Sequence, residues 1–169
     1  MNCEFNWDAQ SFFQRLTESN RFAQESGYVF RCVSGLDGFH GAITNALQTK
    51  AMVAVSDTSE GGLRLDNTPH TSRIKTVFLF FRHKAADESA RNKAMANMRE
   101  LFRQFMSVLI QEKVRLEEGG IYLDQRIAFK EVERYFYANG ACAYFQLRID
   151  TYTNLEYDPD EWIDQPLMK

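Results

Sequence analysis

The strongest hydrophobic pattern in the chain is a β-type segment followed by a long amphipathic segment. Residues 74–81 end in a continuous apolar run, Val77 to Phe81, which is typical of a strand buried on both faces and therefore central in its sheet. Residues 87–113 then carry apolar side chains every three or four positions, which predicts a long helix with one broad apolar face. We expect this helix to stop before the glycine-containing residues 117–120. The predicted core is Val77, Phe78, Leu79, Phe80, Met98, Leu101, Phe105, Leu109, Leu147 and Ile149.

The N-terminal third of the chain alternates between helical and β-type patterns. Asp8 is a good N-cap residue and is followed by apolar side chains at helical spacing, including Phe12 and Phe13. This predicts a first helix that fades through residues 17–20 and resumes briefly before Gly27. The elements expected next are a strand at 28–33, a turn at 34–38, a short helix at 39–47 and a strand at 51–55.

Residues 56–72 have no sustained period and are rich in glycine, serine and threonine. They fit two interpretations, a long mobile loop or a two-stranded flap around Leu63 and Leu65. Long segments of this kind in compact domains are usually functional or disordered. A mobile loop would be cut early by proteases, and the sequence leaves both interpretations open.

The Asn139-Gly140 pair lies between two β-type runs, and Asn-Gly is the preferred pair for a two-residue hairpin turn. A turn at this pair sets Glu131 opposite Arg148, a compatible pair of charges across two strands. One face then gathers Val132, Phe136, Phe145, Leu147 and Ile149, and the other gathers Glu131, Glu133, Gln146, Arg148 and Asp150. We therefore predict a C-terminal β-hairpin with one apolar and one charged face.

These elements predict a single α+β domain over residues 1–169. Its sheet is expected to be mostly antiparallel, with the long helix packed on one face and the C-terminal β-hairpin completing the sheet. A chain of 169 residues has the length of one such domain. Residues 154–169 predict an acidic, irregular tail with Trp162 docked on the body or on a neighbour.

Charge and composition narrow the partners and the compartment. The chain has 20 Lys and Arg against 23 Asp and Glu, so we expect no tight binding of nucleic acid and no anionic membrane partner. No stretch approaches the ~18 apolar residues of a membrane span, and residues 1–8 lack a signal-peptide pattern. We expect a cytoplasmic protein with reduced cysteines at 3, 32 and 142, of which Cys32 and Cys142 are predicted to be buried in strands.

Candidate catalytic chemistry is sparse. His40, His70 and His83 lie in different predicted elements without the spacing of metal ligands, so we expect surface or capping histidines. Asp37 near His40 is best interpreted as a helix N-cap. The sequence assigns no catalytic residue, no cofactor and no metal ligand, which favours a protein that is not an enzyme but leaves that question open.

Three segments resemble small bacteriophage proteins of the head–tail connection, the tail-terminator or tail-completion group. They are the strand at 73–81, the helix after it and the closing strand at 143–149, about half of the chain. The resemblance implies a ring, usually a hexamer, without catalytic residues. It also implies other assembly proteins as partners, nucleic acid that passes through without being gripped, and a place in the virion.

Two functional hypotheses follow. The first is a structural assembly subunit, part of a phage or phage-derived tail-like particle, that forms homo-oligomers through exposed aromatic residues. The candidate contacts are Trp7, Tyr152, Tyr157 and Trp162. The second is a small-molecule-binding protein or an enzyme, with its site between residues 56–72 and the sheet. A polar pocket with convergent groups would favour the second hypothesis, and a head-to-tail contact would favour the first.

Overall fold

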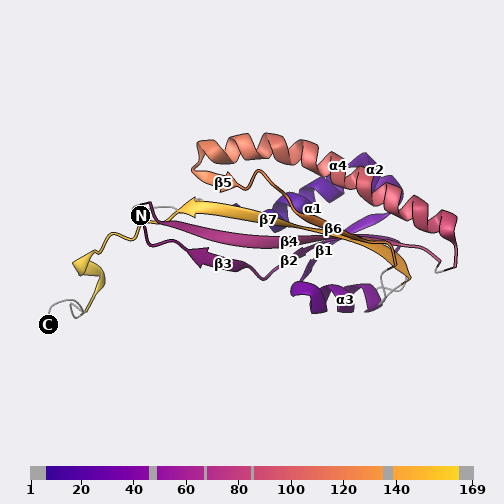
Figure 1. The fold of residues 1–169 in the computed structure, drawn as a ribbon, viewed down its shortest axis with the longest axis horizontal. Coiled ribbons are helices and arrows are strands. Elements are labelled where there is room, and N and C mark those ends of the chain that lie inside the picture. The colour runs from indigo at the N-terminus through magenta and orange to yellow at the C-terminus, as the bar shows by residue number, and fades with distance from the viewer. Residues whose placement is uncertain (1–6, 46–48, 67, 85, 135–138, 164–169) are drawn as a thin grey trace.

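The computed structural model describes residues 7–45, 49–66, 68–84, 86–134 and 139–163, and Figure 1 shows their arrangement. Within these ranges one seven-stranded sheet has the order β1-β2-β4-β7-β5, with β3 beside β4 and β6 beside β7. β1 and β2 pair in parallel and the other neighbours pair antiparallel. The strands are β1 Tyr28–Val33, β2 Ala51–Ser56, β3 Glu60–Leu63, β4 His70–Arg82, β5 Ile121–Leu123, β6 Phe129–Val132 and β7 Gly140–Tyr152. The predicted α+β class is confirmed.

The two longest strands form the centre of the sheet. β4 and β7 pair along their whole length, from His70 opposite Tyr152 to Arg82 opposite Gly140. The other edge of β4 is covered by β2 and β3, and the other edge of β7 by β5 and β6. The central position predicted for residues 74–81 is therefore confirmed.

The helices begin and end at residues with the expected capping chemistry. They are α1 Ala9–Ser19, α2 Arg21–Ser26, α3 Gly35–Asn45, α4 Glu88–Glu118 and a short 3-10 turn, η1, at Pro159–Glu161. Asp8 caps α1 by accepting from the Gln10 N–H, and Asp87 caps α4 by accepting from the Ala90 N–H. α2 ends at Gly27, whose φ of 80° is a left-handed conformation that glycine adopts without strain. α4 runs one turn beyond the predicted end because Leu116 is buried and holds that turn on the body.

α3 begins inside the segment 34–38 that was predicted to be a turn. The Gly38 N–H donates to the Ser34 carbonyl at 3.1 Å, so the helical hydrogen bonds start there. Packing outweighs the weak helix propensity of the glycines, because the Phe39 ring stacks on Phe78 with 4.3 Å between centroids. The predicted Ala46 and Leu47 lie outside the described residues.

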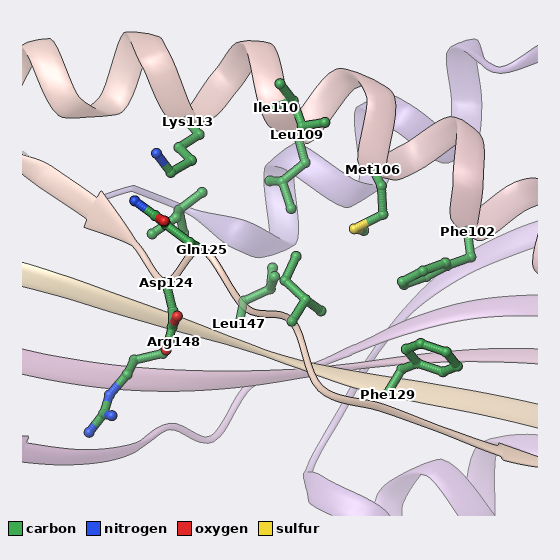
Figure 2. Close-up of a pocket in the computed structure, with 12 residues that line it drawn as sticks. Phe102, Met106, Leu109, Ile110, Lys113, Asp124, Gln125, Phe129, Leu147 and Arg148 are labelled. Atoms are coloured by element: carbon green, nitrogen blue, oxygen red, sulfur yellow. The ribbon is translucent and has the colours of Figure 1, made fainter.

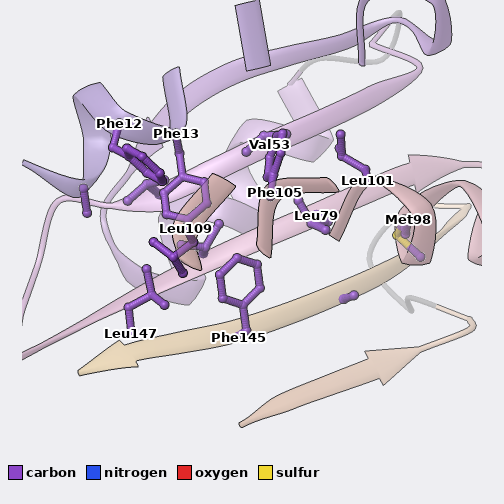
Figure 3. Packing of buried hydrophobic residues seen from close by; sticks show 14 of the residues in the cluster. Phe12, Phe13, Val53, Leu79, Met98, Leu101, Phe105, Leu109, Phe145 and Leu147 are labelled. Atoms are coloured by element: carbon purple, nitrogen blue, oxygen red, sulfur yellow. The ribbon is translucent and has the colours of Figure 1, made fainter. Parts of the chain in front are cut away.

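The helices cover the two faces of the sheet unequally. α1, α2 and α4 lie on one face, and α3 lies on the other face near one end (Figure 1). Figure 3 shows the main core, where Phe13 of α1 lies 5.8 Å from both Phe105 of α4 and Phe145 of β7. All ten predicted core residues are buried. However, Phe78 and Phe80 belong to a second cluster under α3, because successive strand residues point to opposite faces.

The predicted register of the C-terminal hairpin is wrong. β6 does pair with β7, but Glu131 lies opposite Ala143 rather than Arg148. Gly140 is not a turn residue, because it lies in β7 and pairs with Arg82 of β4. The residue opposite Glu131 is thus an odd number of positions along β7 from the predicted one. Because successive strand residues point to opposite faces, such a shift moves each β6 side chain to the face opposite the predicted one. Phe136, which the prediction also used, lies outside the described residues.

The exchange of faces has a clear physical cause in the contacts of β6. Glu131 points toward α4 and pairs with Arg99, while Val132 packs against the cluster under α3. The predicted charged face is therefore divided. Glu131 and Glu133 contact arginines of α4, and Arg148 contacts Ser72 and Asp150 on the other side of the sheet.

Residues 56–72 contain an ordered strand. β3 pairs with β4, with Gly62 opposite Ser72, and the Arg64 N–H donates to the His70 carbonyl at 3.0 Å. At the base of this flap the Lys75 ammonium donates to the carbonyls of Ser56, Asp57 and Thr58. Of the two interpretations of this segment, the structure contains the two-stranded flap.

The cysteines differ from their expected burial. Cys142 is buried in the second cluster, and burial raises the pKa of its thiol to about 12. Cys32 is exposed, contrary to the prediction, because β1 is an edge strand of the sheet. Cys3 lies outside the described residues.

Candidate functional site

The candidate contact residues occupy three different environments. Tyr152 is exposed at the end of β7, and Tyr157 and Trp162 are exposed in the segment after it. Trp7 is buried, which corrects its proposed role as an exposed contact. Its indole N–H donates to Glu112 of α4 at 3.0 Å, and its ring lies 5.3 Å from Phe12. Trp7 therefore holds the start of α1 against α4.

The C-terminal segment, residues 154–163, leaves the end of the sheet and extends away from the body (Figure 1); we name it the tail. Immediately before the tail, the Thr153 N–H donates to the Pro69 carbonyl at 3.0 Å. Asp158 caps η1 by accepting from the Asp160 N–H, and the turn stacks Tyr157 on Trp162 with 6.2 Å between centroids. Trp162 remains 51% exposed and Ile163 fully so. Trp162 thus packs within the tail rather than on the body.

An open polar pocket lies on the sheet face that α3 leaves uncovered. It has a volume of about 460 Å³ and lies between the flap and the ends of β4, β7 and β5. The His70 ring lies 6.4 Å from Tyr122 and 6.0 Å from Tyr152, each in an edge-on arrangement. The Arg148 Nε donates to the Ser72 hydroxyl at 2.9 Å. This pocket lies where the small-molecule hypothesis expects a site.

An apolar groove lies on the opposite side of the sheet, beside α4 (Figure 2). Its volume is about 270 Å³. One wall is α4, the other is the segment from Leu123 to Phe129, and Leu147 of β7 forms the floor. The apolar lining is Phe102, Met106, Leu109, Ile110, Leu123, Ile127, Phe129 and Leu147. We name this site the α4 groove.

The α4 groove exists because the chain leaves β7 between two short strands. β5 ends at Leu123, and the Asp124 carboxylate then accepts from the Arg126 N–H at 2.9 Å in a local turn. Pairing with β7 resumes at Phe129. Two large apolar side chains on the rim stay open to solvent, with Ile110 62% and Phe129 59% exposed. The Arg148 side chain points away from the groove (Figure 2).

The histidines are dispersed, as expected, but one of them is not at the surface. His83 is buried, and its ring nitrogens lie 3.0 Å from the Lys84 carbonyl and 3.2 Å from the Glu133 carbonyl. It therefore links the end of β4 to the end of β6. Asp37 lies in the first turn of α3. Across the part of the chain that the structure describes, no three His, Cys, Asp or Glu side chains are grouped to hold a metal ion.

The arginines at the start of α4 contact carboxylates of the same chain. Arg99 donates two hydrogen bonds to Glu131, and Arg103 donates two to Glu100. Arg91 lies 3.2 Å from Glu88 and 3.8 Å from Glu133. Arg99 lowers the pKa of Glu131, mainly through its hydrogen bonds to the carboxylate. Arg91, Arg99 and Arg103 therefore all form ion pairs within the chain.

The comparisons with known proteins assign no family. No protein-family model matches the chain, and no curated protein matches its sequence. Among the helices in the described ranges, none combines the length and the apolarity needed to cross a bilayer. The described surfaces that suit a partner or a ligand are the α4 groove, the polar pocket and the tail.

Proposed function

We propose that the protein is a structural assembly subunit that is not an enzyme and that associates with further copies of itself. The observation that carries this proposal is the exposure of large apolar side chains at two separate places, Ile110 and Phe129 at the α4 groove and Trp162 and Ile163 in the tail. Apolar surface that stays open on a single chain commonly marks a site of association. Tryptophan and tyrosine are also the usual anchors of protein interfaces.

The resemblance to tail-terminator and tail-completion proteins makes a phage or phage-derived tail-like particle the setting of this role. A ring requires a head-to-tail contact, in which one patch meets a different patch on the next copy. The tail and the α4 groove are two different patches of this kind. In such a particle the protein is made in the cytoplasm, ends in the virion and meets other assembly proteins there.

Nucleic acid is not a tightly held partner in this proposal. The net charge is −3. The guanidinium groups of Arg91, Arg99 and Arg103 are already paired with carboxylates of the same chain, and a phosphate backbone would need such unpaired positive charges to bind. The tail adds carboxylates at Glu156, Asp158, Asp160 and Glu161. A ring of such subunits would let nucleic acid pass without gripping it.

The oligomeric mass of the purified protein tests the proposal. We expect native mass spectrometry and light scattering to find a multimer at micromolar concentration, with a mass that rises with concentration. A monomer across the whole micromolar range would contradict the proposal. A ring seen in negatively stained images would support the phage-like setting, and an open filament would contradict that part alone.

A second candidate function, the binding of a small molecule, is favoured by one observation. The polar pocket brings the rings of His70, Tyr122 and Tyr152 to one face beside Arg148 and Asp150. These aromatic side chains can stack on the ring of a ligand, and the paired Arg148 and Asp150 can form hydrogen bonds with its polar groups. The pocket therefore suits a small molecule that has a neutral, polar ring. NMR titration with a panel of sugars and nucleosides tests this function, with Tyr122→Ala as the variant expected to abolish any shift.

A further inference from the structure

We propose that the tail of one copy docks in the α4 groove of a second copy. This inference rests on the proposed function, since it names the contact by which the subunits associate. The occupant is therefore a segment of the same protein, residues 154–163, and the contact joins two different surfaces. Such a contact repeats from copy to copy and builds a ring if it closes or a filament if it does not.

The tail has the chemistry of an interface anchor. Leu155, Tyr157, Trp162 and Ile163 are all exposed. The η1 turn already stacks Tyr157 on Trp162, with an interplanar angle of 30°. A segment whose side chains are ordered before binding loses less conformational entropy when it binds. The tail thus presents two stacked aromatic rings, with the exposed Ile163 next to Trp162 in the sequence.

The α4 groove has the complementary shape and chemistry. It is concave, and its walls and floor are apolar side chains of α4, the 123–129 segment and β7 (Figure 2). Its volume of about 270 Å³ gives room for large side chains such as those of the tail. Ile110 and Phe129 stand at the rim. Covering them together with Trp162 and Ile163 removes large exposed apolar side chains of both partners from water, which favours association.

The charges around the two surfaces favour the same pairing. The tail carries four carboxylates from Glu156 to Glu161 and no basic residue. The groove side offers the Lys113 ammonium in its lining and the exposed Arg126 beside it. The acidic residue of the lining, Asp124, already accepts a backbone hydrogen bond from Arg126. Lys113 pairs with Glu117 on the same helix, an exposed contact that a tail carboxylate can replace at little cost.

The path of the chain favours a contact between copies over one within a copy. The tail leaves from the end of β7 and extends away from the body instead of turning back over α4 (Figure 1). Its apolar end therefore meets a groove on another molecule when copies line up head to tail.

The test uses two variants that each remove one side of the contact. The first ends after Thr153 and lacks the tail; the second is Ile110→Glu, which places a charge at the groove rim. The matched control is Val114→Glu, because Val114 is on the same helix and 55% exposed but does not line the groove. All three changes affect exposed positions, and circular dichroism with thermal melting verifies that each variant folds.

We expect the wild type and Val114→Glu to form the same multimer in native mass spectrometry, and each of the two contact variants to be monomeric. Mixing the two contact variants should give a dimer of mixed composition and nothing larger, since the Ile110→Glu chain keeps its tail and the shortened chain keeps its groove. Trp162→Ala is a milder variant and should weaken association about tenfold or more.

The outcomes separate this inference from the proposed function. If both contact variants remain multimeric, the proposed contact between tail and groove is wrong, and the copies associate through another surface. If the mixture fails to form the mixed dimer although each variant folds, the contact is also wrong. If the wild type is a monomer, whether its tail folds into its own groove or stays free, both this inference and the proposed function are overturned.

Discussion

The Arg99 guanidinium donates two hydrogen bonds to the Glu131 carboxylate, at 2.9 Å and 2.7 Å, and so joins α4 to β6. This pair lies on the face of β6 that points toward the helix. The pair lies beside the α4 groove. Phe129, two residues before Glu131 in β6, lines that groove, and its ring centroid lies 5.4 Å from that of Phe102 on α4. The pair therefore contributes to the position of one wall of that groove.

The pH dependence of stability tests this pair. Arg99 lowers the pKa of Glu131 below the usual value of 4.5. The unfolded carboxyl group takes up its proton first as the pH falls, so the stabilisation is present above about pH 4.5 and is lost as the pH falls through the lower folded-state pKa. Glu131→Gln should therefore reduce the free energy of unfolding at neutral pH by about 1 kcal/mol or less, because Arg99 is largely exposed.

Urea titrations of wild type and Glu131→Gln at several pH values measure this effect. Glu156→Gln, in the exposed tail, serves as the control and should leave stability unchanged. A difference between wild type and Glu131→Gln that grows as the pH is lowered would contradict the prediction.

Phe105 tests the main core. Its side chain is buried between α4, Phe13 and the sheet, so Phe105→Ala leaves a cavity and should cost about 3–5 kcal/mol. Val108, nearby on the same helix, is partly exposed, and Val108→Ala should cost well under half of that amount. Chemical denaturation gives both values. A loss below about 1 kcal/mol for Phe105→Ala would mean that α4 does not pack on the sheet in this way.

Tyr28 offers a stabilising substitution. Its ring packs 5.8 Å from Phe81, and among the described residues its buried hydroxyl has no hydrogen-bond partner. Burial raises the pKa of Tyr28, and the same loss of hydration weakens the folded state. Tyr28→Phe removes that penalty and should stabilise the fold by about 1 kcal/mol, measured as a higher melting temperature. A lower melting temperature would show that the hydroxyl has a partner such as a buried water.

Gly140 tests the position of β7 beside β4. A Cβ at this position would lie 2.5 Å from the Phe80 ring and 2.8 Å from the Phe81 carbonyl. Gly140→Ala should therefore destabilise the protein by about 1–3 kcal/mol, as overpacking does in other cores. Gly41→Ala in α3 is the matched control, because nothing lies within 4 Å of its Cβ position and alanine favours helix. Equal melting temperatures for the two variants would contradict the close packing of Gly140 against Phe80.

The sequence predicted correctly those helices and strands that a short stretch of residues is enough to identify. The apolar run at Val77–Phe81 and the regular spacing in α4 were enough to place a central strand and a long helix. The same run could not show which helix each residue faces, so the separation of Phe78 and Phe80 from Leu79 emerged only in the structure. The register of β6 was missed because Asn139-Gly140 satisfied a local turn rule, whereas the contacts that decide it join residues far apart in sequence, such as Glu131 with Arg99.

The candidate surfaces were predicted less completely. Tyr152, Tyr157 and Trp162 are exposed, but Trp7 is buried because Glu112, distant in sequence, accepts its indole hydrogen bond. The α4 groove was not foreseen. Its residues Ile110 and Phe129 look like ordinary core positions, and nothing local except Asp124 marks where the chain leaves β7.

The pairing of β4 with β7 determines when the protein can finish folding during synthesis. Even the partners nearest in sequence, Arg82 and Gly140, are separated by the whole of α4, β5 and β6. Contacts between such distant residues form slowly, because a long loop must be ordered before they give any stability. A nascent chain that stops short of Gly140 carries β4 with one hydrogen-bonding edge open, and open edges invite aggregation. Among the described strands, β7 is therefore the last to be synthesised and the one that completes the centre of the sheet.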